Sequence, residues 1–147
     1  MLSNTCKYGI RAVIYLALNG KENEKIDIKR ISKDLKIPTP FLAKILQTLA
    51  KQKILISTKG PHGGFSLGRS PKDIHLIDIV NILDGQDVFN ICLIGLEICD
   101  KAHSAEFHCP IHDKFVPIKT EIIQMFTDET IESLIDNIKN SGKNIKI

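Results

Sequence analysis

The sequence predicts a mainly α-helical fold with one small β-hairpin, and three observations support this prediction. Apolar residues recur at spacings of three and four along several segments, which is the period of amphipathic helices. A single glycine-rich stretch, residues 59–64, separates two short runs that are typical of strands. The chain has 147 residues, of which 43% are hydrophobic, so it can form one domain with a moderate core.

The composition also excludes several classes of protein. The apolar fraction is too high for a disordered chain, and no apolar run is long enough to span a bilayer. The short apolar run at residues 12–18 lacks a small-residue cleavage site, which favours a core helix over a signal peptide and predicts a cytoplasmic protein. No Ser, His and Asp residues surround a nucleophile signature, so we do not expect an enzyme.

Charge is divided unevenly along the chain. Residues 1–75 contain 14 Lys and Arg against 5 Asp and Glu, a net charge of +9. Residues 76–147 contain 6 Lys and Arg against 12 Asp and Glu, a net charge of −6. The basic first half indicates a polyanionic partner such as nucleic acid. The absence of Trp and the scarcity of aromatic residues argue against stacking on single strands.

Two helices are expected at the start of the chain. Residues 4–18 carry apolar side chains on one face, and Asn19 and Gly20 are typical of a helix end. Asp27 is suited to cap a second helix at residues 28–35. That helix would have an apolar face of Ile28, Ile31 and Leu35 and an outward face of Lys29, Arg30 and Lys33.

The third helix has the clearest start signal. Thr39 can be its N-cap, and Pro40 fits the first helical position, where a missing N–H is not needed. Its apolar face would consist of Leu42, Ile45, Leu46, Leu49 and Ala50, and its exposed face of Lys44, Gln47, Thr48 and Lys51. A helix, a short turn and a second amphipathic helix form the helix-turn-helix pattern, which some helical bundles share.

The segment after the third helix makes this interpretation more specific. Residues 54–58 and 65–67 are expected as strands, and the tip between them contains three glycines and a proline. A cationic hairpin after a recognition helix is a wing, whose glycines let the backbone approach phosphates. Lys59 or His62 could reach a minor groove. The alternative is an ordinary hairpin with a soluble tip, and we favour double-stranded DNA as the partner.

The remaining segments are expected to be helices around an irregular stretch. Residues 74–85 would form a helix that ends at Gly85, after which residues 86–112 lose helical periodicity. Pro117 is expected to start or kink the next helix, and Thr127 or Asp128 to cap the last one. The apolar residues of the helix after Pro117 exceed what one small core needs, which predicts pairing with a second copy. These residues are Ile118, Ile122, Met125 and Phe126.

Cysteine and histidine concentrate between residues 92 and 112. Three of the 4 cysteines, Cys92, Cys99 and Cys109, lie there with His103, His108 and His112. Three thiolates and an imidazole are enough ligands for a [2Fe–2S] cluster or a closed zinc site. The alternative is three unligated thiols in a loop. Cys6, in the first helix, is expected to pack in or near the core.

Three motifs stand out in the first helix, the third helix and the hairpin. They are Lys7-Tyr8-Gly9-x-Arg11-Ala12-x-x-Tyr15-Leu16-Ala17, Ile37-Pro38-x-x-Phe41-Leu42-x-Lys44-Ile45-Leu46-x-x-Leu49 and Lys59-Gly60-Pro61-x-Gly63-Gly64-Phe65-x-Leu67. Together with the cysteine loop, they resemble the Rrf family of bacterial repressors, which includes IscR, NsrR and CymR. The resemblance covers residues 2–139.

This resemblance implies a homodimer of winged helix-turn-helix protomers in which the long helix after the cysteine loop pairs with its mate. It also implies a [2Fe–2S] or [4Fe–4S] cluster on the three loop cysteines, with His112 as the fourth ligand and His103 or His108 as reserves. Loss of the cluster or its reaction with nitric oxide would change DNA affinity. The chain departs from the family in its longer gap between Cys99 and Cys109. It also departs in having Lys7 and Tyr8 where some relatives place an acidic ligand, and Lys59 where many have arginine.

We therefore predict a winged helix-turn-helix domain at residues 1–85, a cluster-binding loop at residues 86–112, dimerisation and packing helices at residues 113–139 and a flexible tail at residues 140–147. The protein would bind a palindromic operator as a transcriptional regulator, expected to be a repressor, that senses iron–sulfur status, redox state or nitric oxide. The alternatives are a clusterless regulator of the same type that senses a metabolite or partner protein, and a zinc-binding adaptor. The predicted metal ligands are Cys92, Cys99, Cys109 and His112, and the predicted DNA contacts are Thr39, Pro40, Lys44, Gln47, Thr48, Lys51, Lys59, Gly60, His62 and Gly63.

Overall fold

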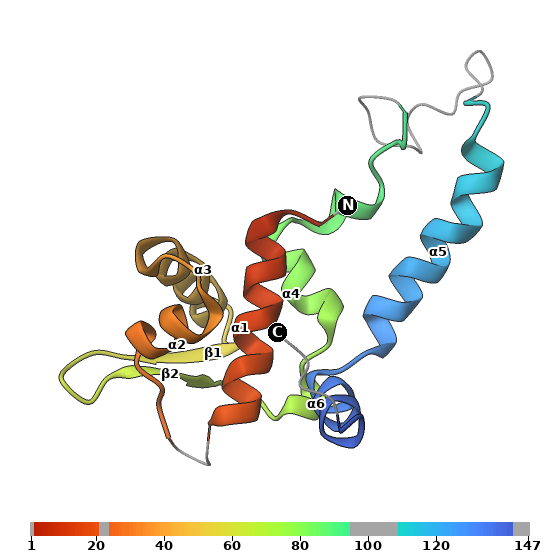
Figure 1. Cartoon of the computed structure of the whole chain (residues 1–147). Helices are drawn as coiled ribbons and strands as arrows, with labels where there is room; N and C mark the ends of the chain where they lie inside the picture. Colours follow the sequence, from red (N-terminus) through yellow and green to blue (C-terminus); the bar gives the residue numbers. More distant parts are fainter. Residues whose placement is uncertain (1, 21–23, 95–108, 143–147) are drawn as a thin grey trace.

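The computed structural model describes residues 2–20, 24–94 and 109–142. Within these ranges the protein is mostly helical, with one two-stranded antiparallel sheet, so the predicted fold class is confirmed (Figure 1). No helix in these ranges combines the length and the apolar content needed to cross a membrane. The elements are α1 (Asn4–Asn19), α2 (Ile28–Leu35), α3 (Thr39–Lys51), β1 (Leu55–Thr58), β2 (Gly64–Leu67), the 3₁₀ helix η1 (Pro71–Asp73), α4 (Leu76–Leu83), the 3₁₀ helix η2 (Gln86–Phe89), α5 (His112–Asp128) and α6 (Ile131–Asn140).

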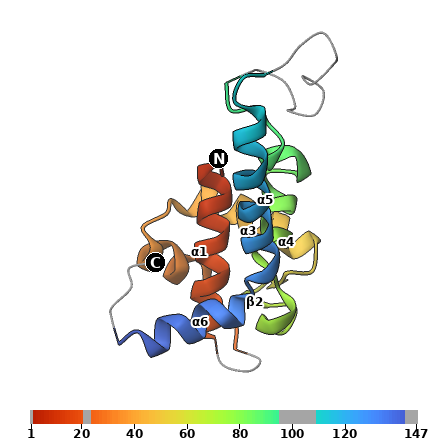
Figure 2. The same cartoon turned by 90° about the vertical axis from the view of Figure 1, so that its right-hand side faces the viewer.

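Helix α1 is the centre of the fold. It packs against α2, α3, α4, α6 and β2, and these elements lie around it in the two views (Figures 1 and 2). The positions from Ala12 to Leu16 are all buried, because a helix with neighbours on several sides has little surface left for solvent. Cys6 has no exposed surface, which confirms its prediction as a core residue.

Helix α3 presents the predicted apolar face to this core. Leu42, Ile45, Leu46 and Leu49 are buried, and they continue into the buried Ile54 and Leu55 at the start of the hairpin. Because both the helix and the hairpin are anchored to one core, their outward faces keep a fixed relation to each other.

The start of α3 differs from the prediction by one residue. Pro38 is the N-cap, so Thr39 is the first helical residue and Pro40 the second. The Thr39 hydroxyl donates to Ser32 Oγ at 2.8 Å, and the helix start has no side-chain cap. The threonine is therefore used to connect α3 to α2 rather than to cap α3.

The C-terminal helices also begin elsewhere than predicted. Helix α5 starts at His112 and continues through Pro117, so this proline does not start the helix. The N-cap of α6 is Thr130 rather than Thr127 or Asp128, which belong to the last turn of α5. Thr130 Oγ1 accepts from the Ser133 amide and Ser133 Oγ accepts from the Thr130 amide, both at 3.1 Å. Thr130 and Ser133 therefore form the reciprocal cap, whereas Thr127 and Asp128 are still helical residues of α5.

Helix α5 is the least buried of the long helices. Figure 1 shows it standing beside α4 and away from α1. Its one buried residue among those described is Lys119, whose ammonium donates to Asn90 Oδ1 at 3.4 Å. Ile118 and Met125 are 54% and 52% exposed, whereas Phe126 packs on the core and on Phe89, with ring centroids 5.4 Å apart.

Candidate nucleic-acid interface

The outward face of α3 carries polar and cationic side chains. Lys44, Gln47 and Lys51 are exposed, as is Pro40 at the helix start. Thr48 is half-buried and donates its hydroxyl to the Lys44 carbonyl at 2.9 Å. The long side chains at positions 44, 47 and 51 recur at spacings of three and four, so they form one face that can enter a groove of a duplex.

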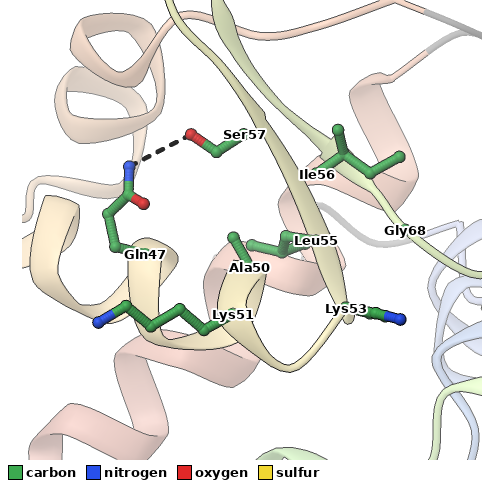
Figure 3. A pocket seen from close by; sticks show the side chains of 8 residues that line it. All are labelled: Gln47, Ala50, Lys51, Lys53, Leu55, Ile56, Ser57 and Gly68. Carbon is green, nitrogen blue, oxygen red and sulfur yellow. Dashed lines mark hydrogen bonds between the residues drawn. The ribbon is translucent and has the colours of Figure 1, made fainter.

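Gln47 also connects this face to the hairpin. Its Nε2 donates to Ser57 Oγ of β1 at 3.2 Å, across a groove of about 550 Å³ (Figure 3). The bond leaves the amide oxygen available as an acceptor. Lys51 and Lys53 both line the groove, but their side chains point away from each other (Figure 3). The exposed face of α3 and the hairpin are therefore held as one surface.

The tip of the hairpin is exposed and cationic. Lys59, Gly60 and His62 are exposed, and Gly63 is half-buried. Gly60 has φ +108, and the Gly63 amide donates to the Gly60 carbonyl at 2.9 Å. A side chain at Gly60 would be strained in this conformation, so the turn depends on glycine.

The hairpin is fixed to the body by a contact that the sequence did not reveal. Ile26 and Phe65 exchange two backbone hydrogen bonds of 2.9 Å, so the residues before α2 form a bridge with β2. Gly64 permits this approach, because a Cβ at Gly64 would lie 2.4 Å from the Ile26 carbonyl oxygen. Short runs such as Glu24–Ile26 carry no periodicity, so no local signal predicts the pairing.

The turn between α2 and α3 is held by a network that reaches α1. Ser32 Oγ donates to the Ile37 carbonyl at 2.6 Å and accepts from Thr39. Arg11 Nη2 donates to the Leu35 carbonyl at 3.5 Å, and its guanidinium lies 5.9 Å from the Tyr8 ring centroid. The sequence motifs included Arg11 and Tyr8 but gave Ser32 no role. These contacts fix the position of α3 relative to α1 and α2.

The predicted metal ligands lie partly outside the described residues. Cys99, His103 and His108 are not among them. Cys92 is 7% exposed and Cys109 is half-buried. His112 is the first residue of α5, and its amide donates to the Cys109 carbonyl at 3.1 Å, so these two residues are one turn apart. Thiolates and an imidazole suit iron–sulfur or zinc binding, although the described ranges alone contain no group of three such donors.

The C-terminal end of α5 is joined to the residues that begin α4. His75 Nδ1 donates to the Thr127 carbonyl at 2.6 Å, and the Leu76 amide donates to the Glu129 carbonyl at 3.0 Å. The link between α5 and α6 thereby forms a bridge with the residues that begin α4. Helix α4 in turn packs on α1 and α3.

Comparison with known proteins agrees with this architecture. Residues 2–137 match the model of the Rrf2 family, described as an iron-dependent transcriptional regulator. The chain is 35% identical over 136 residues to an HTH-type transcriptional regulator of Aquifex aeolicus, a match covering 92% of each chain.

Two solved structures are similar at low sequence identity. B. subtilis CymR, described as the global cysteine regulator, superposes with a TM-score of 0.75 at 20% identity and covers 92% of this chain and 96% of its own. T. potens IscR gives a TM-score of 0.72 at 20% identity and covers 99% of this chain and 93% of its own. At this identity the two structures establish the fold. The family and its members are transcriptional regulators rather than enzymes, and this chain belongs to the Rrf2 family of transcriptional regulators.

Proposed function

We propose that the protein is a homodimeric repressor that binds a palindromic operator through α3 and the hairpin and senses iron–sulfur status, redox state or nitric oxide. The observation that carries the DNA-binding part is the Gln47–Ser57 hydrogen bond of 3.2 Å, which joins the exposed face of α3 to the hairpin within the basic half of the chain. In this proposal residues 1–85 bind DNA, residues 86–112 carry the cluster and residues 113–139 provide dimer contacts.

The side chains of α3 and of the hairpin would have different roles on the duplex. Gln47 and Lys44 would read base edges in the major groove, where an amide suits adenine and an ammonium suits guanine. Lys51 and Lys59 would lie on phosphates or at the minor groove. The remaining contacts would be supplied by Thr39, Pro40, Thr48, Gly60, His62 and Gly63.

Variants of Gln47 and Lys59 test these roles. Gln47→Ala should relax sequence preference and cost about 1–3 kcal/mol on a selected operator, because a bidentate base contact is lost. Lys59→Ala should weaken binding to all duplexes alike and lower the salt slope by about one per protomer. Fluorescence anisotropy over a salt series, with an operator selected from a random library, measures both. Parent-like affinity and slope in both variants would show that the surface is placed wrongly.

The dimer would form through α5. Helices in a monomer normally cover one apolar face, yet Ile118 and Met125 of α5 are more than half exposed. A second copy of the same helix would cover them in a two-fold arrangement. The two recognition helices would then lie about 34–36 Å apart, one turn of DNA.

The cluster would be held by Cys92, Cys99 and Cys109, with His112 as fourth ligand. Such a group, most simply a [2Fe–2S] cluster, would supply iron that responds to oxidants and nitric oxide. An imidazole in the fourth place would raise the reduction potential and make the group easier to lose, which suits a sensor. His112 is suited to this position because it lies one turn from Cys109, joined by the 3.1 Å backbone hydrogen bond.

The chain provides a connection from this segment to the DNA-binding surface. The Lys119–Asn90 contact joins α5 to the residues just before Cys92, and the His75–Thr127 bond joins the far end of α5 to α4. A state of the loop that favours one position of α5 would therefore favour one position of α4, which packs on α3. Coupling of this kind shifts the population that binds DNA.

Anaerobic reconstitution tests the cluster. We expect the parent to gain visible absorption bands with matching iron and sulfide, and each of Cys92→Ala, Cys99→Ala and Cys109→Ala to lose most of both. Cys6→Ala is the matched control, since Cys6 is buried in α1 and should leave iron uptake unchanged. A colourless parent with bound zinc would favour a zinc site, and a parent that takes up no metal would overturn the cluster.

A clusterless regulator of the same family is the second candidate. The observation in its favour is the 7% exposure of Cys92, because a buried thiol also serves as a small packing residue. Such a protein would respond to a metabolite or a partner protein instead. The reconstitution experiment separates the two candidates.

A further inference from the structure

A pocket of about 230 Å³ lies where α1, α3 and α4 pack together, and it shares no residue with the groove between α3 and the hairpin. Its apolar wall is formed by Phe41, Ile45, Ile82 and Leu83. Phe41 is 39% exposed, whereas the leucines and the isoleucine of α3 are buried. A dry apolar cavity of about 150 Å³ holds a benzene ring, so this pocket has room for a ring or a branched chain together with a polar group.

The rim of the pocket is polar and carries the positive charge of Lys44. It consists of Thr5 in the first turn of α1 and of Lys44 and Thr48 of α3. The Lys44 ammonium and the Thr5 hydroxyl have no hydrogen-bond or ionic partner among the described residues. Thr48 donates its hydroxyl to the Lys44 carbonyl at 2.9 Å, so it is already engaged as a donor. An ammonium and an unengaged hydroxyl on one rim are donors that suit an anion.

Lys44 has no acidic neighbour in the pocket. No carboxylate is found among the described residues that line it. Asp84, which follows Leu83 in the chain, accepts hydrogen bonds from the Ser3 amide at 2.7 Å and from the Ser3 hydroxyl. This carboxylate is therefore bound to the start of α1 rather than to Lys44. The charge of Lys44 is left for a ligand.

These features select the chemical class of the ligand. A carboxylate on an aromatic ring or a branched chain would place its apolar part against the wall and its oxygens on Lys44 and Thr5. Inorganic phosphate would leave the apolar wall in contact with water, and a neutral hydrocarbon would leave the ammonium without a partner. Small-molecule sites are commonly of this mixed kind, mostly apolar with few polar groups that fix the orientation of the ligand.

Lys44 also belongs to the proposed DNA-binding surface. Its exposed side chain lies on the face of α3 that carries Gln47 and Lys51, where an ammonium would read a guanine. A carboxylate on Lys44 neutralises this charge and places an anion beside the bound duplex, so the ligand and DNA oppose each other. By linkage, each then weakens the binding of the other by the same factor.

We propose that this pocket binds a small carboxylate with an aromatic or branched apolar group, and that the bound ligand releases the protein from DNA by engaging Lys44. The inference rests on the proposed DNA-binding function and gives it an effector site separate from the cysteine segment. Lys44 and Thr5 hold the carboxylate, and the wall around Phe41 holds the apolar group.

Ligand binding is tested first, without DNA. Benzoate and 3-methylbutanoate are titrated into the isotope-labelled protein, and the amide chemical shifts of Thr5, Lys44 and Ile82 are followed by NMR. We expect saturable shifts, with benzamide and acetate binding about tenfold more weakly, because benzamide lacks the charge and acetate lacks the apolar group. Lys44→Met should weaken benzoate binding to the same degree. Lys51→Met is the matched control, since it removes an equal charge outside the pocket and should keep benzoate binding.

Release from DNA is tested second. Anisotropy of a labelled operator is measured with benzoate and with the same concentration of acetate, so that the ionic strength is equal. We expect benzoate to weaken DNA binding by the parent several-fold relative to acetate. Ile82→Phe places a larger side chain in the apolar wall, so this variant should bind DNA like the parent but respond equally to the two anions. Urea unfolding checks that the variant is folded.

The proposal is overturned if neither carboxylate gives saturable shifts in the parent, or if Lys44→Met binds benzoate as tightly as the parent. Shifts at these amides that follow protein concentration instead would show that a second copy covers the pocket, which also overturns it. Equal effects of benzoate and acetate on DNA binding by the parent would overturn the release of DNA. A parent that binds benzoate in the pocket but no duplex at low salt would leave the site in place and overturn the proposed DNA-binding function.

Discussion

Cys6 is a single residue whose chemistry is set by its surroundings. It has no exposed surface in α1, and burial, followed by the nearby Asp84 carboxylate, raises the pKa of its thiol from 9.0 to about 12. Asp84 is held there by the Ser3 amide and hydroxyl at the start of α1. Burial and the bond to Asp34 also raise the pKa of Tyr15. Both groups are therefore neutral in the folded protein at pH values where the unfolded chain begins to ionise.

Stability should consequently fall at alkaline pH. A raised pKa in the folded state gives stability that is complete below the unfolded pKa and is lost as pH rises, here between about 9 and about 12 for Cys6. The loss can approach about 1.4 kcal/mol per pH unit. Urea unfolding at several pH values measures it, and Cys6→Ala should show a shallower decline than the parent. Equal slopes in the two proteins would refute the assignment to Cys6.

At the scale of elements, the hairpin depends on its bridge to the residues before α2. Gly64 and Gly60 both have positive φ, at +150 and +108, but their surroundings differ. A Cβ at Gly64 would lie 2.4 Å from the Ile26 carbonyl oxygen, whereas a Cβ at Gly60 would meet nothing within 4 Å. Gly64 is therefore needed both for its backbone conformation and for the close approach of β2 to Ile26, whereas Gly60 is needed for its conformation alone.

Alanine at these two positions separates the two requirements. Gly60→Ala should destabilise the protein by about 1–2 kcal/mol, the cost of a left-handed conformation for an L-residue. Gly64→Ala should cost more, because the Ile26–Phe65 bridge must open as well, and amide exchange at Ile26 and Phe65 should accelerate. Chemical denaturation and hydrogen exchange provide the measurements. Equal losses in the two variants, with unchanged exchange at Ile26, would contradict the docking role.

At the scale of the whole molecule, α5 carries an apolar surface that the described residues do not cover. Of the four apolar residues predicted for pairing, Phe126 instead packs on Phe89 and the core. Ile118 and Met125 remain exposed and are seven residues apart, so they share one face. The exposed pair is therefore the part of α5 available to a second copy.

Charged residues on this face should dissociate the proposed dimer. Ile118→Asp and Met125→Asp bury carboxylates in an apolar contact, and each should convert the dimer to monomer at micromolar concentration. Thr120→Asp is the control, since Thr120 is an exposed position of the same helix and its hydroxyl donates to the Val116 carbonyl of that helix. Sedimentation velocity in reductant gives the result. A monomeric parent, or variants that remain dimeric, would exclude α5 as the contact.

The helices were predictable because their signals are local. The apolar period of α1, α2 and α3 lies within each segment, and the glycines of residues 59–64 mark the hairpin without reference to distant residues. The caps were less predictable. Thr39 and Thr130 have equivalent hydroxyls, and only contacts with Ser32 and Ser133 decide that the first connects two helices and the second caps one.

The sequence by itself determined the family, the helix-turn-helix with its hairpin and the exposed face of α3, because periodicity, turn residues and motifs all act over short distances. The tertiary structure decided the contacts between segments: the Ile26–Phe65 bridge, the Gln47–Ser57 bond and the inward turn of Lys119. These contacts form between residues that are far apart in the chain and meet only when the core has formed. No local sequence pattern identifies the partners of such residues.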